Sequence, residues 1–339
     1  MEQAEFDALA TYLPRHVPGF AGLNEAKRFS GGQSNPTYLL IALSGRYVLR
    51  RKPGGPILPS AHAIDREYRL LKALDATAVP VARALHYCED AAVIGAEFYV
   101  MAFLDGVLHW DPALPGLPPE LRRPATFAMV DTLAALHKVD WRAAGLGDFG
   151  KPGDYAARQL ARWTRQFRAT QDGSYPRMEK LISHLEENLP PEDGRASLVH
   201  GDFRIDNLMY EKNSAEVLAV LDWELATIGH PFADLAYMLM HHRLPNTGVF
   251  HGLAGIDREK QHLPGQAEIV ERYRQGVGIG RMGDLNFWIS LSAFRLAAIL
   301  EGVRARIEEG NASDPERGRR LIKSIPELIE MGLNPDLAV

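Results

Sequence analysis

The chain has 339 residues, of which 46% are hydrophobic and 24% are charged, so it is long enough to bury a large core and to divide into two lobes. Its formal net charge of −5 and its isoelectric point of about 6.2 give no electrostatic reason to expect a nucleic-acid or membrane-surface partner. Cys88 is the single cysteine, which excludes an intrachain disulfide.

The start of the sequence lacks the features of an export signal. The segment MEQAEFDALATYLPRHV is acidic and amphipathic, without the basic start and apolar core of a signal peptide. No uncharged apolar run approaches the length that spans a bilayer. Together with the lone cysteine, which suits a reducing compartment, these features predict a cytoplasmic protein without a membrane partner.

The N-terminal part of the chain alternates helix-like and strand-like segments. Apolar spacing predicts helices over residues 2–13 and 61–74 and strands over residues 37–42, 47–51, 82–87 and 97–103. The loop FSGGQSN, at 29–35, precedes the first of these strands. Its residues Gly31, Gly32 and Ser34 would let the backbone lie close over phosphate groups, although an ordinary hairpin turn explains the same small residues.

The C-terminal part is mainly helical. Helices are predicted over residues 120–139, 154–169, 232–242, 266–276, 284–309 and 314–331. The second of them carries four arginines, Arg158, Arg162, Arg165 and Arg168. A solvated basic face is the default interpretation of these arginines, and a site for an anionic acceptor is the alternative. A long loop marked by Gly and Pro is predicted over 246–265, either near a substrate site or flexible.

The polar residues of the stretch 197–239 carry the chemistry. Strands are predicted over 197–199, 207–210 and 217–221. The first leads into a loop containing Asp202, and the other two form a hairpin that brings Asn207 close to Asp222. Phosphoryl transfer needs one carboxylate to orient and deprotonate a hydroxyl, and further oxygen ligands for magnesium. The spacing therefore suits transfer of a phosphate from a nucleotide.

The motifs HGDFRIDN and LDWE resemble the signature of the aminoglycoside phosphotransferase and choline kinase superfamily. Among its branches, YVLRRKP and GLGDFGKPGDYAARQLARW are most similar to the one also found fused to acyl-CoA dehydrogenases. The resemblance implies an α+β, protein-kinase-like fold with two lobes. An antiparallel-sheet lobe at 1–105 would bind the nucleotide, and a mainly helical lobe at 106–339 would carry the catalytic loop and acceptor site. The implied roles are catalytic base for Asp202 and magnesium ligands for Asn207 and Asp222.

The resemblance also implies which residues hold the phosphates. Protein kinases grip them with a strand lysine, and here Arg50 stands at the equivalent place, with Lys52 as the alternative on the same strand face. Glu67 is the implied partner of Arg50, matching the ion pair of kinases. Pairing of Glu67 with its neighbours Arg66 or Arg69 is the competing interpretation.

Four further residues receive an interpretation from the resemblance. Met101 and Phe103 lie at the expected hinge between the lobes and would contact the adenine base, although burial explains them equally well. Asp148 belongs to an Asp-Phe-Gly triplet that copies the magnesium motif of protein kinases, but it precedes the catalytic loop and is therefore interpreted as a turn residue. Asp234 is expected to support the catalytic loop through backbone hydrogen bonds.

The sequence therefore predicts a kinase that uses Mg²⁺ and ATP, with GTP left open, to phosphorylate a hydroxyl of a small molecule. The implied branch makes hydroxyacyl compounds candidate acceptors. A protein Ser or Thr remains open as an acceptor, and so does the oligomeric state. Two alternatives come from other classes: a catalytically inactive nucleotide-binding regulatory module, and a metal-dependent hydrolase that uses His200, His230, His241 and His242.

Overall fold

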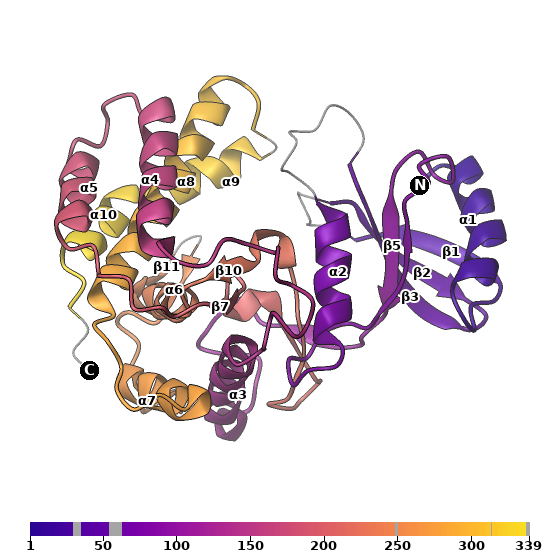
Figure 1. Cartoon of the computed structure of the whole chain (residues 1–339), viewed down its shortest axis with the longest axis horizontal. Coiled ribbons are helices and arrows are strands. Elements are labelled where there is room, and N and C mark those ends of the chain that lie inside the picture. Colours follow the sequence, from indigo (N-terminus) through magenta and orange to yellow (C-terminus); the bar gives the residue numbers. More distant parts are fainter. Residues whose placement is uncertain (30–34, 54–62, 248–249, 313, 337–339) are drawn as a thin grey trace.

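The computed structural model places the sheet-rich part of the chain beside a larger helical part (Figure 1). It describes residues 1–29, 35–53, 63–247, 250–312 and 314–336. The predicted phosphate-loop residues Gly31, Gly32 and Ser34 lie outside the described residues. Among those described, no helix is both long enough and apolar enough to cross a membrane.

A five-stranded antiparallel sheet forms the N-terminal part, with the strand order β1-β2-β3-β5-β4. Its elements are α1 (Gln3–His16), β1 (Leu23–Arg28), β2 (Thr37–Ala42), β3 (Gly45–Arg51), α2 (Ile64–Leu74), β4 (Ala84–Cys88) and β5 (Phe98–Ala102). Residues of β2 alternate between buried and half-buried, as expected for a strand with faces in different surroundings. Leu9 and Leu13 of α1 pack on one face of the sheet with Leu40 and Leu49.

Helix α2 covers the other face and belongs to the main core of the molecule. Its residues Ile64, Leu70 and Leu74 form one continuous apolar cluster with Tyr99 of β5 and with the helical part of the chain. The two faces of β3 therefore meet different partners. One faces α1, and the other faces α2 and the loops of the helical part.

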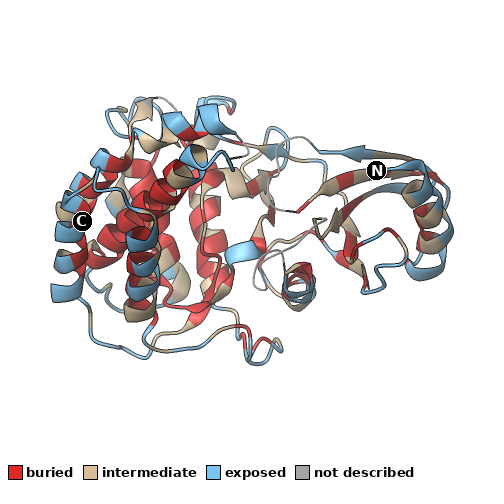
Figure 2. Ribbon diagram, turned by 90° about the horizontal axis from the view of Figure 1, so that it is seen from above, coloured by how far each residue is buried: buried red, intermediate tan, exposed pale blue. Residues whose placement is uncertain are grey.

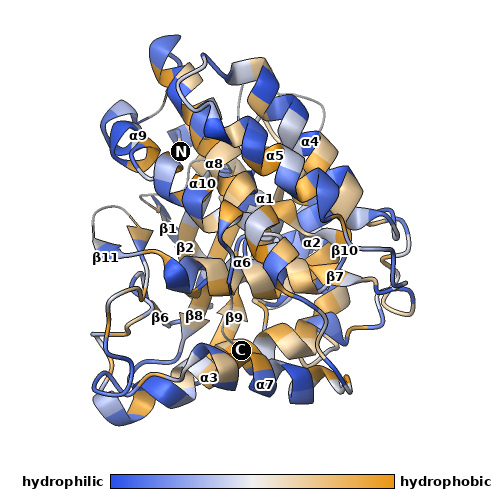
Figure 3. Cartoon of the chain, turned by 90° about the vertical axis from the view of Figure 1, so that its left-hand side faces the viewer, coloured by the Kyte–Doolittle hydropathy of each residue, from blue (hydrophilic) through white to orange (hydrophobic). Residues whose placement is uncertain are grey.

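The helical part is built around two deeply buried helices, α6 and α8, and Figure 2 shows buried residues concentrated in the interior of this part. Its helices are α3 (Pro119–His137), α4 (Tyr155–Thr170), α5 (Arg177–Glu187), α6 (Phe232–Arg243), α7 (Gln266–Val277), α8 (Asn286–Glu308), α9 (Pro315–Ile322) and α10 (Ile325–Leu333). Figure 3 shows hydrophilic residues interspersed with hydrophobic ones along α4 and α5, the pattern of amphipathic helices with one buried face.

The chain also contains several short strands, some of which flank the loops of the predicted site. They are β6 (Val107–Leu108), β7 (Ser197–Val199), β8 (Leu208–Tyr210), β9 (Val217–Val220), β10 (Thr227–Gly229), β11 (Asn246–Thr247) and β12 (Phe250–His251). Strands β8 and β9 form the predicted antiparallel hairpin, which β6 extends, whereas β7 pairs with β10. The predicted antiparallel-sheet and helical architecture is confirmed.

Two predictions about individual elements were wrong or incomplete. The helix predicted over 314–331 is two helices, α9 and α10, separated at Lys323 and Ser324. Pro326 explains the break, because it lacks a backbone N–H and is tolerated only in the first turn of a helix, where it begins α10. Helix α5, strand β1 and the short strands β6, β10, β11 and β12 were not predicted, and the last two lie within the range 246–265 that was predicted as a loop.

Candidate active site

Asp234 holds the backbone of the loop that carries Asp202. One carboxylate oxygen accepts the N–H of His200 at 2.6 Å and the other accepts the N–H of Gly201 at 2.8 Å. The Asp234 side chain is only 1% exposed, and Nε2 of His137 lies 3.3 Å from it. These backbone contacts are the ones predicted for Asp234 from the sequence.

Asp202 directly follows His200 and Gly201 in the chain and lies close to several hydrogen-bond donors. Asn207 Nδ2 donates to the backbone oxygen of Asp202 at 2.8 Å and to its Oδ2 at 3.0 Å. Burial favours a higher pKa for Asp202, but Arg204, the Tyr237 hydroxyl and His200 outweigh it, so the pKa lies below its ordinary value. The Asp202 carboxylate is therefore ionised at neutral pH and able to accept a proton.

The β8–β9 hairpin brings Asn207 and Asp222 together as predicted. Leu221, at the end of β9, donates its N–H to the backbone oxygen of Asn207 at 2.8 Å. Asp222 follows directly, with a left-handed backbone (φ 59°, ψ 64°) that Asp tolerates better than most residues. Its side chain is 43% exposed, so a carboxylate oxygen remains accessible. Carboxylate and amide oxygens are ligands that Mg²⁺ accepts, and Asn207 and Asp222 therefore fit a magnesium site.

Arg50 joins the two parts of the molecule at this point. Its Nε lies 3.0 Å from Glu67 Oε2 on α2, and its Nη2 lies 3.5 Å from Asp222 Oδ1. Lys52 pairs instead with Glu97, at 2.5 Å. Of the two cations considered from the sequence, Arg50 is thus the one that reaches Glu67 and Asp222.

Arg66 and Arg69, the alternative partners considered for Glu67, contact other residues. Arg69 pairs with Asp148, with Nη1 2.9 Å from Oδ2. Arg66 donates to the backbone oxygen of Phe149 at 2.8 Å. Asp148 is exposed and lies against α2, so the structure supports its interpretation as a turn residue.

Burial makes the proton affinity of Glu67 unusual. It raises the pKa of Glu67 to about 7, although the attraction of Arg50 opposes the shift. Between pH 4.5, which is the ordinary pKa of Glu, and pH 7, the folded protein therefore keeps a proton on Glu67 that the unfolded chain has already lost. Because the folded state binds this additional proton, the free energy of unfolding falls as the pH rises through this range.

Glu67→Gln should remove this pH dependence. We expect the free energy of unfolding of wild type, relative to Glu67→Gln, to fall by about 3 kcal/mol between pH 4.5 and pH 7 and to stay constant above. Urea unfolding of both proteins without nucleotide, at a series of pH values, measures the difference. A difference that rises with pH would show that Arg50 keeps Glu67 ionised throughout.

The histidines do not converge on one metal site. His200 Nε2 donates to the backbone oxygen of Leu221 at 2.8 Å, and His230 stacks on Trp288 with the rings 4.3 Å apart. His241 Nε2 lies 3.4 Å from Arg204. Across the described residues, no group of three or more His, Cys, Asp and Glu side chains could hold a metal ion.

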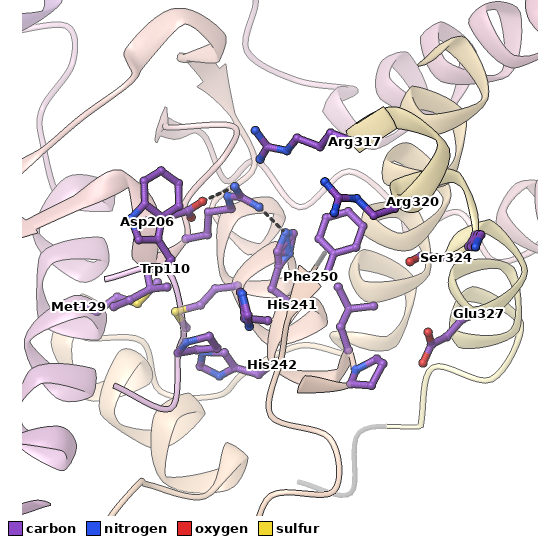
Figure 4. Close-up of a pocket in the computed structure, with 18 residues that line it drawn as sticks. Trp110, Met129, Asp206, His241, His242, Phe250, Arg317, Arg320, Ser324 and Glu327 are labelled. Atoms are coloured by element: carbon purple, nitrogen blue, oxygen red, sulfur yellow. Dashed lines mark hydrogen bonds and ion pairs between the residues drawn. The ribbon is translucent and has the colours of Figure 1, made fainter. Parts of the chain in front are cut away.

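A cavity of about 690 Å³ opens beside the predicted catalytic loop, residues 200–207 (Figure 4). Arg204 and Asp206 of this loop form part of its wall, and the Arg204 Nε lies 4.0 Å from Asp202 Oδ1. Phe250 and His251 also line it, so the segment predicted as a loop over 246–265 does contribute to the space beside the catalytic loop. A small molecule in this cavity could therefore contact Arg204, which lies next to the Asp202 carboxylate.

Comparison with known proteins shows the family of this chain. Residues 25–268 match the sequence profile of the phosphotransferase enzyme family. A mouse (Mus musculus) relative, acyl-CoA dehydrogenase family member 10, is 44% identical over 326 residues, which are 95% of this chain and 30% of the relative. The chain belongs to the phosphotransferase enzyme family. It spans less than a third of the length of this relative.

Solved structures of phosphotransferases show the same fold. A Ralstonia eutropha protein, described provisionally as an aminoglycoside phosphotransferase, is 42% identical, with a TM-score of 0.89 and 97% of each chain covered. An aminoglycoside phosphotransferase solved with AMP-PNP and hygromycin B has a TM-score of 0.63 at 16% identity, covering 98% of this chain and 99% of the other. This second likeness concerns the fold alone.

Some residues of this phosphotransferase site were not anticipated. Tyr237 lies one helical turn after Asp234, so the i, i+3 spacing on α6 was the signal that it faces the same loop. Arg204 lies within the motif itself but has no assigned role there. Met101 and Phe103, the residues predicted at the hinge, lie at and just after the end of β5, where the Arg46 guanidinium lies 4.2 Å from the centre of the Phe103 ring. Their contact with a nucleotide base stays a prediction.

Proposed function

We propose that the protein is a kinase that transfers the terminal phosphate of ATP to a hydroxyl of a small molecule. The observation that carries this proposal is the meeting of Arg50, Glu67 and Asp222 from both parts of the chain beside the Asp202 loop. The part at 1–105 would hold the nucleotide, and the part at 106–339 would hold the acceptor. GTP remains an alternative donor.

Each residue has a role that its surroundings support. Asn207 and Asp222 would hold Mg²⁺, which supplies positive charge to the nucleotide phosphates. Arg50, kept in place by Glu67, would position those phosphates. The acceptor oxygen would form its bond to the terminal phosphorus as the bond to the bridging oxygen breaks, and ADP would leave with that electron pair. Asp202 would accept the hydroxyl proton.

We propose a hydroxyacyl compound as the acceptor class, because the chain is similar to part of a relative named as an acyl-CoA dehydrogenase family member. An inactive regulatory module is a weaker proposal, since Asp202, Asn207 and Asp222 are all present and positioned. A metal-dependent hydrolase is weaker as well, because the described histidines have separate partners.

Transfer of label tests the function directly. The protein is incubated with magnesium, with ATP labelled on its terminal phosphate, and with hydroxy acids or their coenzyme A thioesters. Label in a small organic product, released by phosphatase, would establish the kinase. Label found only in inorganic phosphate across the whole series would contradict it.

Asp222→Asn should weaken magnesium-dependent nucleotide binding, because it replaces the accessible carboxylate with a neutral amide. We expect the affinity for a nonhydrolysable ATP analogue to fall about tenfold or more in the presence of magnesium. Titration calorimetry with and without magnesium measures the effect. Asp148→Asn is the matched control, since it alters the Asp of the similar triplet and should bind as wild type. Equal losses in both variants would remove Asp222 from the magnesium site.

A further inference from the structure

Three cations, two in α9 and one at its C-terminal cap, form one wall of the cavity beside the loop that carries Asp202. Arg317, Arg320 and Lys323 recur at every third residue, and all three line the cavity. Figure 4 shows the side chains of Arg317 and Arg320 extending from α9 toward the side where Asp206 lies. The periodicity of the helix thus directs a row of positive charge toward the cavity.

Close packing fixes which side of α9 faces the cavity. Gly318 is buried against α8, and a Cβ atom there would lie 2.7 Å from Ile307 Cδ1 and 3.0 Å from Val303 Cγ1. A larger residue would push the helices apart, so glycine permits this approach. With Gly318 against α8, Arg317 and Arg320 are left on the accessible surface.

The cavity contains more cations than carboxylates. Among the described residues, Arg317, Arg320 and Lys323 make no ion pair with an acidic side chain. Asp206, one of the two lining acids, is already paired with Arg204, and Glu327 is the other. With Arg204 and Asp206 paired, the described lining leaves three cations against the single carboxylate of Glu327, so positive charge is in excess.

Two buried histidines of the lining, His241 and His242, do not change this balance of charge. Burial lowers the pKa values of His241 and His242 to about 3, with the nearby positive charge of Arg204 adding to the effect at His241. Both are therefore neutral near pH 7. They can contact a ligand without adding charge.

The arginines of α4 are a poorer site for an anion. Arg168 pairs with Glu179, Nη2 to Oε2 at 2.7 Å, and Arg158 donates to the backbone oxygen of Lys151 at 2.5 Å. None of the four α4 arginines is among the described residues that line the cavity. Of the two basic helices, α9 is the one beside the catalytic loop.

The rest of the cavity wall is largely apolar. Met129, Met238, Leu244 and Phe250 line it, and Trp110, which is 63% exposed, stands at its edge. A ligand with a hydrocarbon portion would bury apolar surface here. The cavity thus combines an apolar wall, a cationic wall and a third wall formed by Arg204, Ile205 and Asp206, which follow Asp202 in the chain.

We propose that Arg317, Arg320 and Lys323 bind an anionic group of the hydroxyl acceptor, a carboxylate or a phosphate. The apolar part of the acceptor lies against Met238 and Phe250, and its hydroxyl points toward the catalytic loop. This inference rests on the proposed function, because it assigns the cavity to the acceptor. It names the acceptor class as hydroxy compounds with an apolar segment and a negative end.

Binding measurements without catalysis test the cationic wall. The probes are straight-chain hydroxy acids of short, medium and long chain, their methyl esters and their coenzyme A thioesters, titrated into the full chain in a calorimeter. We expect the best acid or thioester to bind about tenfold or more tightly than its ester, and this preference to weaken as salt is raised. Tighter binding of the acid identifies a carboxylate, and tighter binding of the thioester identifies phosphate.

Substitutions assign the preference to α9. In Arg317→Gln/Arg320→Gln/Lys323→Gln, the affinity for the anionic probe should fall about tenfold or more while that for the ester stays unchanged. Arg319→Gln, which removes a cation from the same helix outside the cavity, should bind as wild type. Circular dichroism and nucleotide binding show whether the triple variant is folded.

Failure of this inference and failure of the kinase proposal give different results. Equal affinity of wild type for acid, thioester and ester would overturn the inference, and so would unchanged anion binding in the folded triple variant. Anion binding at α9 without any phosphate transfer would contradict the kinase and leave the anion site in place. Transfer to the anionic acceptor that the triple variant performs as fast as wild type, at an acceptor concentration far below saturation, would retain the kinase and reject the anion site.

Discussion

Asp202→Asn is expected to slow phosphate transfer by about 10²–10⁴-fold and to leave nucleotide affinity nearly unchanged. The substitution keeps the shape of the side chain but removes its ability to take the hydroxyl proton. Asn207, which donates to Asp202 at 3.0 Å, could still donate to an amide oxygen, so the loop should keep its conformation. Single-turnover rates with labelled ATP, together with nucleotide titrations, separate the chemical step from binding.

Asp131→Asn serves as the control for this variant. Asp131 is a half-exposed acid on α3 that pairs with Arg272 at 2.7 Å, and its replacement should leave transfer unchanged. Because the pKa of Asp202 lies below its ordinary value, its titration should not limit the wild-type rate near neutral pH. Turnover by Asp202→Asn at a rate close to that of wild type would remove Asp202 from the role of base.

The sequence was informative where contacts are local. Asp202, Asn207 and Asp222 are close in the chain, and the turn between β8 and β9 is enough to bring the last two together. The strand period likewise separates Arg50, which faces α2, from Arg51, which pairs with Glu5 of α1. In these cases the local pattern and the tertiary contacts require the same arrangement.

The sequence was less informative where distant elements meet. The pairing of Arg50 with Glu67 was implied by the family resemblance, because residue spacing alone left Arg66 and Arg69 as competing partners of Glu67 and cannot specify how α2 packs. The cations of α9 were hidden in a range interpreted as one long helix, although Pro326 already signalled a break. The direction in which these cations point depends on the contact of Gly318 with α8, and the spacing of residues in the sequence does not reveal that contact.

Asp234→Asn is expected to destabilise the protein by about 2–5 kcal/mol and to disturb the catalytic loop as well. The two oxygens of Asp234 each accept a backbone N–H, from His200 and Gly201, inside a buried site. An amide has one oxygen, so its NH₂ group must face one of these N–H groups and leave that donor unsatisfied. Denaturant unfolding measures the loss of stability, and transfer rates measure the effect on the loop.

The pH dependence distinguishes this mechanism from a loss of packing. Burial acts to raise the pKa of Asp234, but the hydrogen bond and charge of His137 and the loop contacts prevail and lower it. The stability that Asp234 contributes is therefore present above its ordinary pKa of 3.8 and is lost as the pH falls through its folded value. The difference between wild type and Asp234→Asn should shrink only in acid, whereas lost packing would cost the same at every pH. Asp148→Asn, at an exposed ion pair, should destabilise the protein far less than Asp234→Asn does.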